Sequence, residues 1–172
     1  EQASKIKAIF ESGTHVMWTV NRNMEYTSFN QNFSDAVQEI SGKAPLINEK
    51  VSQPEATPPN DQLGKLWLEK YNAAFAGKAI EFVSDRVNRN GETVYRQIYL
   101  HPIYHEDKIV EVSGMGIDIT DKINSEEKIV NQAAKLGAIF EGSSHYIWTT
   151  DKSSRLTSFN KNFVDLIKKT YG

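Results

Sequence analysis

The sequence predicts an α+β fold: a five-stranded antiparallel sheet with helices on one face, flanked by an N-terminal helix and a connector helix. Three observations lead to this prediction. A segment near the start of the chain is repeated 130 positions later, an apolar helical stripe covers residues 61–76, and three β-rich segments follow between residues 79 and 120. A helix with so broad an apolar stripe must bury it, and one face of the sheet is the surface that it would cover.

The repeat relates residues 1–35 to residues 131–165. In this alignment 17 of 35 positions are identical, which chance does not produce. The matching positions of the first copy are Gln2, Ala3, Lys5, Ala8, Ile9, Phe10, Glu11, His15, Trp18, Thr19, Thr27, Ser28, Phe29, Asn30, Asn32, Phe33 and Asp35. We therefore expect a lead-in helix at 1–13, a complete domain at 14–120, a connector helix at 121–142 and the truncated start of a second domain at 143–172.

The first copy predicts a helix, a hairpin and a second helix. Apolar residues recur at helical spacing over residues 2–11. Residues 16–20 and 26–29 flank a polar turn, as the strands of a hairpin do. Asn30 is a favourable N-cap for the helix that follows, and a Ser-Gly pair ends each of the two helices.

The middle of the chain predicts a loop, a covering helix and a meander. Residues 43–60 contain four of the five prolines and predict an irregular connector. The helix of residues 61–76 comes next. The last predicted strand leads directly into the connector helix, for which Thr120 or Asp121 would be the N-cap. Three strands form the antiparallel meander, at residues 79–88, 92–104 and 108–120.

Composition limits the classes of function. The 172 residues carry a net charge of −2 and contain no cysteine. This charge gives no electrostatic footprint for nucleic acid or an anionic membrane. The lack of cysteine excludes disulfides, thiolate metal sites and cysteine nucleophiles. No apolar run approaches the length of about 18 residues that a membrane helix needs. We therefore expect a cytoplasmic segment without membrane contact, although its parent protein can carry an anchor elsewhere.

Several short motifs, taken in their order and spacing, carry a family resemblance. They are Trp18-Thr19-Val20-Asn21, Phe29-Asn30-Gln31-Asn32-Phe33, the helix end from Tyr71 to Gly77, Asn90-Gly91, Pro102-Ile103 and Gly116-Ile117-Asp118-Ile119-Thr120. With them the chain resembles a PAS sensory domain, of the tandem kind that precedes the catalytic parts of bacterial sensor histidine kinases. The resemblance covers residues 8–125 and begins again from residue 138.

The resemblance implies a sensory input domain of a larger signalling protein, such as the histidine kinase of a two-component system. A small molecule or a partner would be sensed in the domain. The signal would pass through the closing strand into the connector helix, with Asp118, Thr120 and Asp121 as relay residues. The chain departs from the family pattern at Asn21, where an acidic residue is common, and in the turn at residues 105–108, which lacks the usual glycine.

No residues for catalysis or metal binding stand out. His15 and His145 are one position in two copies, and His101 and His105 flank a proline at a strand end. No pair sits at i, i+4 on a predicted helix, as the ligands of a helical metal site do. We therefore expect no metal site and no enzyme activity in this chain. The cofactor stays unknown, because haem-binding relatives use a histidine on the long middle helix and flavin photochemistry in light-sensing relatives needs a cysteine.

Aromatic and cationic side chains favour a ligand pocket between the covering helix and the sheet. A small ligand would lie against Trp67 and Tyr71, with an arginine that suits an acidic metabolite. The alternative is a filled core with its arginines in solvent, because strand alternation alone does not show which face points inward. The candidate ligand-binding residues are Trp67, Tyr71, Arg86, Tyr95, Arg96, Tyr99, Tyr104 and Met115.

Two functional hypotheses therefore remain: a ligand-sensing input domain, and a ligand-free module for dimerisation and relay. Residues 143–172 bear on the second. They hold two strands and a helix of the later copy but none of the long strands that would cover them. Their apolar side chains, Trp148 among them, form a surface too large to leave in water. We therefore expect a homodimer that depends on this segment.

Overall fold

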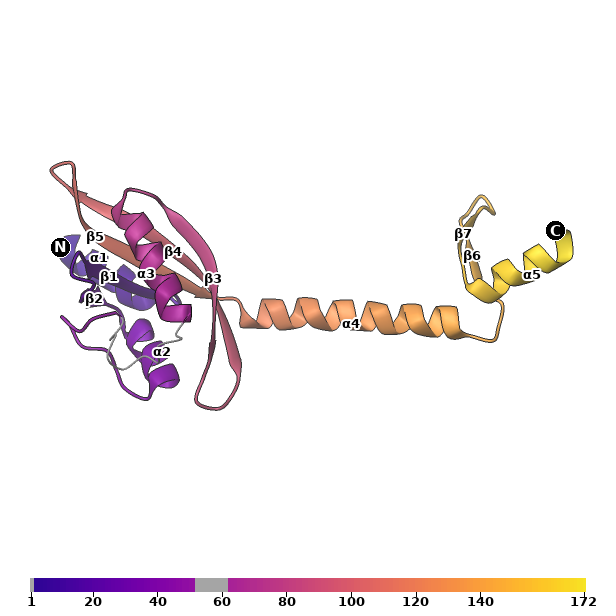
Figure 1. Cartoon of the computed structure of the whole chain (residues 1–172), viewed down its shortest axis with the longest axis horizontal. Coiled ribbons are helices and arrows are strands. Elements are labelled where there is room, and N and C mark those ends of the chain that lie inside the picture. Colours follow the sequence, from indigo (N-terminus) through magenta and orange to yellow (C-terminus); the bar gives the residue numbers. More distant parts are fainter. Residues whose placement is uncertain (1, 52–61) are drawn as a thin grey trace. The chain divides into compact units, whose positions relative to one another are not determined.

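The computed structural model describes residues 2–51 and 62–172 and has two compact units, Glu1–Asp121 and Lys122–Gly172 (Figure 1). They are called the first unit and the second unit. Helix α4 (Thr120–Gly142) begins in the first unit and continues in the second as one element. The connector helix is thus continuous, as predicted.

The first unit is built on a five-stranded antiparallel sheet in the order β2-β1-β5-β4-β3. This order confirms the predicted α+β class. The central strand is β5, which pairs with β1 from Val16 opposite Gly116 to Asn21 opposite Glu111. The strands β3, β4 and β5 form the predicted meander. The strands are β1 (Val16–Asn21), β2 (Tyr26–Phe29), β3 (Ile80–Val87), β4 (Thr93–His105) and β5 (Lys108–Asp118).

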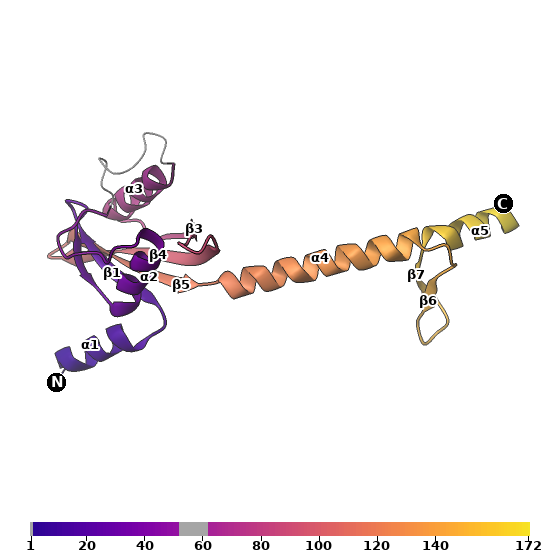
Figure 2. The ribbon, with the colours of Figure 1, turned by 90° about the horizontal axis from the view of Figure 1, so that it is seen from below.

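Helices α2 (Gln31–Ser41) and α3 (Gln62–Phe75) lie on one face of this sheet, whereas α1 (Gln2–Ser12) lies on the other side (Figure 2). The apolar stripe of α3 is turned to the sheet, as predicted. From residue 52 to residue 60, the predicted irregular connector lies outside the described residues. The buried core consists of Val16, Trp18, Val20, Phe33, Ala36, Tyr71, Ala74, Ile98, Leu100 and Val112. Each large side chain buried there contributes about 1.5–3 kcal/mol.

Asn30 joins α1, β1 and α2 at one point. Its side-chain oxygen accepts hydrogen bonds from the Met17 and Phe33 amides, both at 3.0 Å. Its amide group donates to the Phe10 and His15 carbonyls at 3.0 and 2.9 Å. The Phe33 bond is the predicted helix N-cap. The other three bonds explain why this residue is buried, with only 1 % of its surface exposed.

The second unit repeats this joint. Asn160 accepts hydrogen bonds from the Ile147 and Phe163 amides, both at 3.1 Å, and donates to the Phe140 and His145 carbonyls at 3.1 and 2.9 Å. The sequence repeat is therefore also a structural repeat over these elements, while their identity as the truncated start of a second domain stays a prediction. Besides most of α4, the unit contains β6 (Trp148–Thr150), β7 (Leu156–Phe159) and α5 (Lys161–Tyr171).

The start of α4 is bonded to β4. The Thr120 hydroxyl accepts a hydrogen bond from the Tyr95 amide, and the Ile119 amide donates to the Tyr95 carbonyl, both at 2.9 Å. The first helix amide, that of Thr120, donates to the Asp118 carboxylate at 2.9 Å. The predicted capping by Thr120 or Asp121 is therefore wrong. The Thr120 hydroxyl is used by the neighbouring strand, and the acceptor near the helix start is Asp118.

Both departures from the family pattern occur in well-formed turns. Asn21 accepts hydrogen bonds from two amides of its own turn, as Asp151 does in the later copy. In the hairpin between β4 and β5, Glu106 and Asp107 take φ angles of +47° and +61° without a glycine, the conformation of a tight two-residue turn. Over residues 2–51 and 62–172, no helix has the length and apolar character to cross a membrane.

Candidate functional site

The first unit contains a cavity of about 560 Å³ between the sheet, α2, α3 and residues 43–51. Small-molecule sites typically enclose about 300–1,000 Å³, so this volume is sufficient for a metabolite. Apolar side chains make most of the wall. The main contributors are Phe33, Val37 and Ile40 from α2, Trp67 and Tyr71 from α3, and Val16, Trp18, Ser84, Arg86, Val94, Arg96 and Ile98 from the strands.

Two glycines of β5 make room on the sheet side of this cavity. A Cβ atom at Gly114 would overlap the Trp18 ring, and one at Gly116 would lie 2.6 Å from Val16 Cγ2. Real side chains do not approach so closely, so the Trp18 ring keeps its position only over a glycine. The central strand therefore sets how deeply Trp18 sits in the cavity wall.

An aromatic cluster forms the apolar part of the site. Trp18 Nε1 donates a buried hydrogen bond of 2.7 Å to the Tyr71 hydroxyl, which joins β1 to α3. Burial raises the pKa of Tyr71 well above its ordinary value. Trp67 packs against Trp18, Tyr71 and Phe82, with ring centroids 6.1, 5.8 and 5.0 Å apart. Its buried Nε1 has no hydrogen-bond partner among the described residues, which costs about 1–3 kcal/mol.

Cationic side chains stand on the cavity side of β3 and β4. Ser84 pairs with Arg96 across the two strands, and Arg86 pairs with Val94. The two arginines are therefore diagonal neighbours on the two strands, whose backbone positions lie about 7–8 Å apart. Both line the cavity. Ser84 lies beside them and is 5 % exposed.

The opposite wall includes Tyr26, Lys43 and Glu49. Lys43 Nζ lies 3.0 Å from Glu49 Oε1. A hydrogen bond from the Leu46 amide, followed by that from Lys43, lowers the pKa of Glu49. Burial raises the pKa of Tyr26, the Glu49 charge raises it further, and the Arg86 charge opposes both. Arg86 and the Tyr26 hydroxyl are therefore electrostatically coupled across the cavity.

Four of the candidate ligand-binding residues line this cavity: Trp67, Tyr71, Arg86 and Arg96. Tyr95, Tyr99 and Met115 do not. They alternate with Arg96, Ile98 and Gly116 along their strands, so their side chains point to the other face of the sheet. Tyr104 also lies away from the cavity, beyond the bulge after Ile103 in β4, and is 56 % exposed.

Other residues of the site were not among the predicted ligand-binding residues. Trp18 and Phe33 are conserved between the two copies of the repeat, and both line the cavity. The repeat alone did not show that they face the cavity. Gly114 carried no such signal, because its importance depends on the Trp18 ring above it. Tyr26 belongs to a short edge strand, and only the packing of β2 brings its hydroxyl to the cavity.

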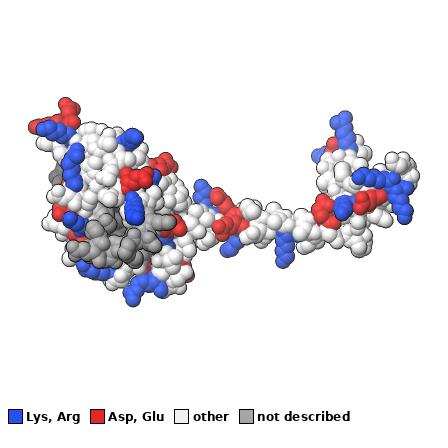
Figure 3. Space-filling model, viewed as in Figure 1, with Lys and Arg blue, Asp and Glu red and all other residues white. Residues whose placement is uncertain are grey.

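Surface charge adds no second candidate site on the face shown in Figure 3. Acidic and basic side chains are interspersed there over the first unit, and no wholly basic or acidic region appears. Within residues 2–51 and 62–172, no group of three or more His, Asp or Glu side chains is placed to hold a metal ion. The cavity is therefore the candidate site.

Comparison with known proteins identifies the fold. No protein-family model and no curated protein matches the chain. A PAS domain from Colwellia psychrerythraea matches with a TM-score of 0.52 at 17 % identity, over 70 % of this chain and 98 % of that chain.

Two larger solved structures are also similar. A phage VqmA–DPO complex has a TM-score of 0.53 at 14 % identity, over 77 % of this chain and 59 % of that chain. An RNA-binding light-oxygen-voltage receptor has a TM-score of 0.54 at 11 % identity, over 77 % of this chain and 37 % of that chain. At such identities the similarity identifies architecture alone. With the strand order β2-β1-β5-β4-β3, the first unit has the PAS fold.

Proposed function

We propose that the chain is a sensory input segment of a larger signalling protein. A small molecule in the cavity changes how β5 leads into α4, and α4 passes that change onward. Its role is binding and relay rather than catalysis. The output domain that agrees with the sequence resemblance is a histidine kinase, and the second unit is the start of a second domain of the same kind.

The position of Tyr95 carries this proposal. Its neighbours in β4, Val94 and Arg96, both line the cavity. Its own backbone bonds to Thr120 and Ile119 at the start of α4. A ligand that moves either neighbour therefore moves the residue that holds the helix. The Tyr95 side chain is absent from the cavity wall, but its backbone joins the cavity to α4.

The similar structures support the proposal at the level of fold. One is an RNA-binding light-oxygen-voltage receptor, and another is a complex of VqmA with DPO. A similar fold therefore occurs in a receptor and in the VqmA–DPO complex. For this chain, we propose a ligand within the cavity of the first unit.

The coupling is tested by NMR on the full chain. Addition of a cavity ligand should shift the amide signals of Tyr95, Ile119 and Thr120. Replacement of Thr120 by valine removes the acceptor for the Tyr95 amide and should weaken the shifts at Ile119, whereas serine at this position keeps the hydroxyl and the coupling. Binding that leaves the Ile119 and Thr120 signals of the unmodified chain unchanged would contradict the proposal.

The relay is tested in the parent protein. One residue inserted after Lys122 turns everything downstream on α4 by about 100°, so the output of the kinase should change. An output that stays the same after this insertion would refute transmission through α4.

A ligand-free dimerisation module is the second candidate, and the surface of α4 favours it. Four apolar residues follow the spacing of a coiled-coil seam, and Lys135 is the one charged residue between positions 129 and 140. Ile129 and Leu136 are 64 % and 66 % exposed. Two copies pairing along α4 would cover this seam, which consists of Ile129, Ala133, Leu136 and Phe140.

Light scattering separates the two possible dimer contacts. Leu136→Lys places a charge on the seam and should give a monomer, whereas Asn131→Lys adds the same charge on the opposite side of the helix and should leave the dimer intact. A chain ending at Gly142 tests the other contact. If it is monomeric while Leu136→Lys remains dimeric, the interface lies in residues 143–172, where Trp148 and Phe159 are 52 % and 48 % exposed. A monomeric full chain would refute the dimer.

A further inference from the structure

We infer that the ligand of the cavity is a small monocarboxylate with an apolar body, and that its carboxylate binds at Arg96 and Arg86. This inference rests on the proposed sensing function and names the chemical class that the site selects.

Within the described residues, the cavity wall carries more positive than negative side chains. Four cationic side chains, those of Lys43, Lys50, Arg86 and Arg96, line it, against the carboxylate of Glu49. That carboxylate is paired with Lys43 at 3.0 Å. Of the other three cations, Arg86 has an interaction of its own. The excess of positive charge on the described wall favours an anion.

Arg96 is the cation that most needs a partner. Its guanidinium forms no hydrogen bond or ion pair with any residue that the structure describes. It projects from the cavity side of β4, where a Cβ atom at Gly116 would lie 3.7 Å from its Cδ, and it is only partly exposed. A partly buried charge without a partner is unfavourable. A carboxylate matches the planar guanidinium with two parallel hydrogen bonds.

Neutral polar groups complete this end of the cavity. Ser84 is directly opposite Arg96 on β3, and Arg86 is its diagonal neighbour. The Tyr26 hydroxyl is coupled to Arg86 and takes part in none of the hydrogen bonds within the described residues. One carboxylate bound between the arginines can accept from these hydroxyls as well, so both of its oxygens find donors.

The rest of the wall selects an apolar body. The aromatic rings of Trp18, Phe33 and Trp67 and the aliphatic side chains of Val37 and Ile98 line it. A second carboxylate placed among these groups would lose its hydration without gaining a charged partner. The site therefore favours a monocarboxylate over a dicarboxylate, with an aromatic or aliphatic body.

The test uses the full chain and pairs of acids and their neutral amides. The probes are phenylacetate, 3-phenylpropionate, indole-3-acetate, hexanoate and octanoate, each compared with its primary amide by isothermal titration calorimetry. For at least one pair, the acid should bind at least tenfold more tightly than the amide. Acid and amide share shape and apolar body, so this ratio reports the carboxylate alone.

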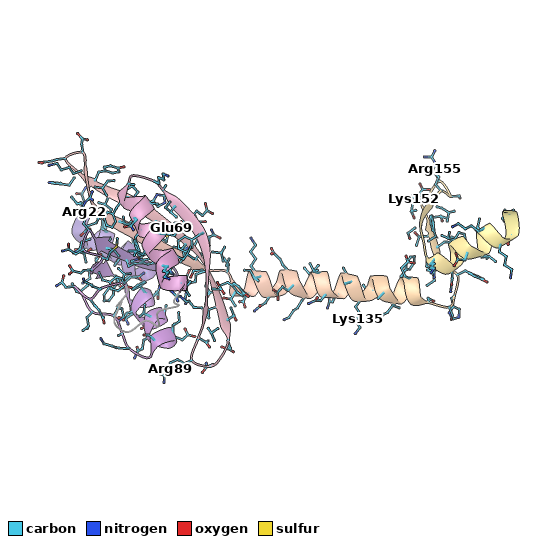
Figure 4. The ribbon with its side chains drawn as sticks, viewed as in Figure 1. Arg22, Glu69, Arg89, Lys135, Lys152 and Arg155 are labelled. Carbon is cyan, nitrogen blue, oxygen red and sulfur yellow. The ribbon has the colours of Figure 1, made fainter. Side chains whose placement is uncertain are left out.

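Two variants locate the effect. Arg96→Gln should remove the preference for the acid while the amide still binds, and Arg96→Lys should keep part of it. Arg89→Gln is the matched control, because it changes the net charge equally at an exposed side chain that points outward from the first unit (Figure 4). This control should retain the full acid preference. Thermal unfolding of each variant verifies that it is folded.

The outcomes separate this inference from the proposed function. The carboxylate site would be refuted if acids and amides bound equally, or if the acid preference survived Arg96→Gln. Either result would leave the proposed sensing function unaffected. If neither the acids nor the amides bind, both proposals fail. Tighter binding of an acid that depends on Arg96 supports both.

Discussion

Trp18 and Trp148 occupy the same position in the two copies of the repeat, yet Trp18 is 3 % exposed and Trp148 is 52 % exposed. Their immediate surroundings agree. Each ring stacks on the phenylalanine of the following helix, with centroids 4.8 Å apart for Trp18 and Phe33 and 5.2 Å apart for Trp148 and Phe163. The local segment is therefore sufficient for the stacking, whereas burial of the ring depends on residues elsewhere in the chain.

In the first unit, those distant residues come from β5 and α3. Gly114 lies beneath the Trp18 ring, and the Tyr71 hydroxyl accepts its hydrogen bond. In the second unit, the described part of the chain pairs β6 with β7 alone. The comparison teaches that about a quarter of the domain carries its own backbone geometry, and that the rest of the domain supplies the core.

The largest expected difference between the copies comes from removing each tryptophan ring. Trp18→Ala should destabilise the first unit by about 3–5 kcal/mol, the cost of a large cavity. Trp148→Ala should change stability by less than about 0.5 kcal/mol, as surface substitutions do. Urea unfolding followed by circular dichroism measures both. Equal losses would mean that Trp148 is buried in solution, against another copy or a partner.

Removal of the buried asparagines should affect both copies alike. Asn30→Ala and Asn160→Ala each remove four side-chain hydrogen bonds, to two amides and two carbonyls, and should cost about 2–3 kcal/mol of stability per copy. Hydrogen exchange should become faster at the Phe33 amide in the first variant and at the Phe163 amide in the second. Asn30→Asp is the control, since it keeps the acceptor for the Phe33 amide. Unequal effects in the two copies would show that the joint depends on the remainder of the domain.

Gly114→Ala tests the long-range part of the core directly. The added methyl group overlaps the Trp18 ring, so we expect a loss of about 1–3 kcal/mol. In a Trp18→Ala background the same change should cost much less, because the ring is gone. Gly137→Ala in α4 is the control, since no atom lies within 4 Å of the added Cβ; it should stabilise by about 0.5–1 kcal/mol. Additive losses for Gly114 and Trp18 would refute the contact.

The smallest expected effect appears at high pH. Burial raises the pKa of Tyr26 and Tyr71, so both stay protonated in the folded state while the unfolded chain ionises. Their stabilising contribution is complete below the unfolded value of about 10 and is lost as pH rises above it, by less than about 1 kcal/mol per tyrosine at pH 10.5. Tyr26→Phe should reduce the fall in the free energy of unfolding with rising pH, measured by urea unfolding at several pH values. Tyr146→Phe in the second unit should not change the curve of the first.

Much of the fold was predictable because its signals are local. The hairpins, the N-cap at Asn30 and the stripe of α3 each depend on residues close in sequence. The inner face of β4 was not predictable, because alternation separates Arg96 from Tyr95 without stating which points to the helices. The site was therefore predicted in part: Trp67, Tyr71, Arg86 and Arg96 line the cavity, whereas Tyr95, Tyr99, Tyr104 and Met115 do not.

The remaining errors have the same origin. Thr120 was predicted to cap α4, but its hydroxyl binds the Tyr95 backbone, which is 25 positions earlier in the chain. Gly114 was part of no motif because its role is defined by a ring 96 positions away. Both are long-range contacts, which a pattern of neighbouring residues does not encode.

Helix α4 is held at each end by a different kind of bond. At its start the Thr120 hydroxyl meets the Tyr95 backbone, and near its end the Phe140 carbonyl accepts from Asn160. Residues added between Thr120 and Phe140 lengthen the helix and also rotate these two bonded residues relative to each other about the helix axis. Seven added residues restore the original angle to within about 20°. Natural variants of such a connector should therefore differ in length by whole heptads, because other insertions would rotate one end of the helix relative to the other.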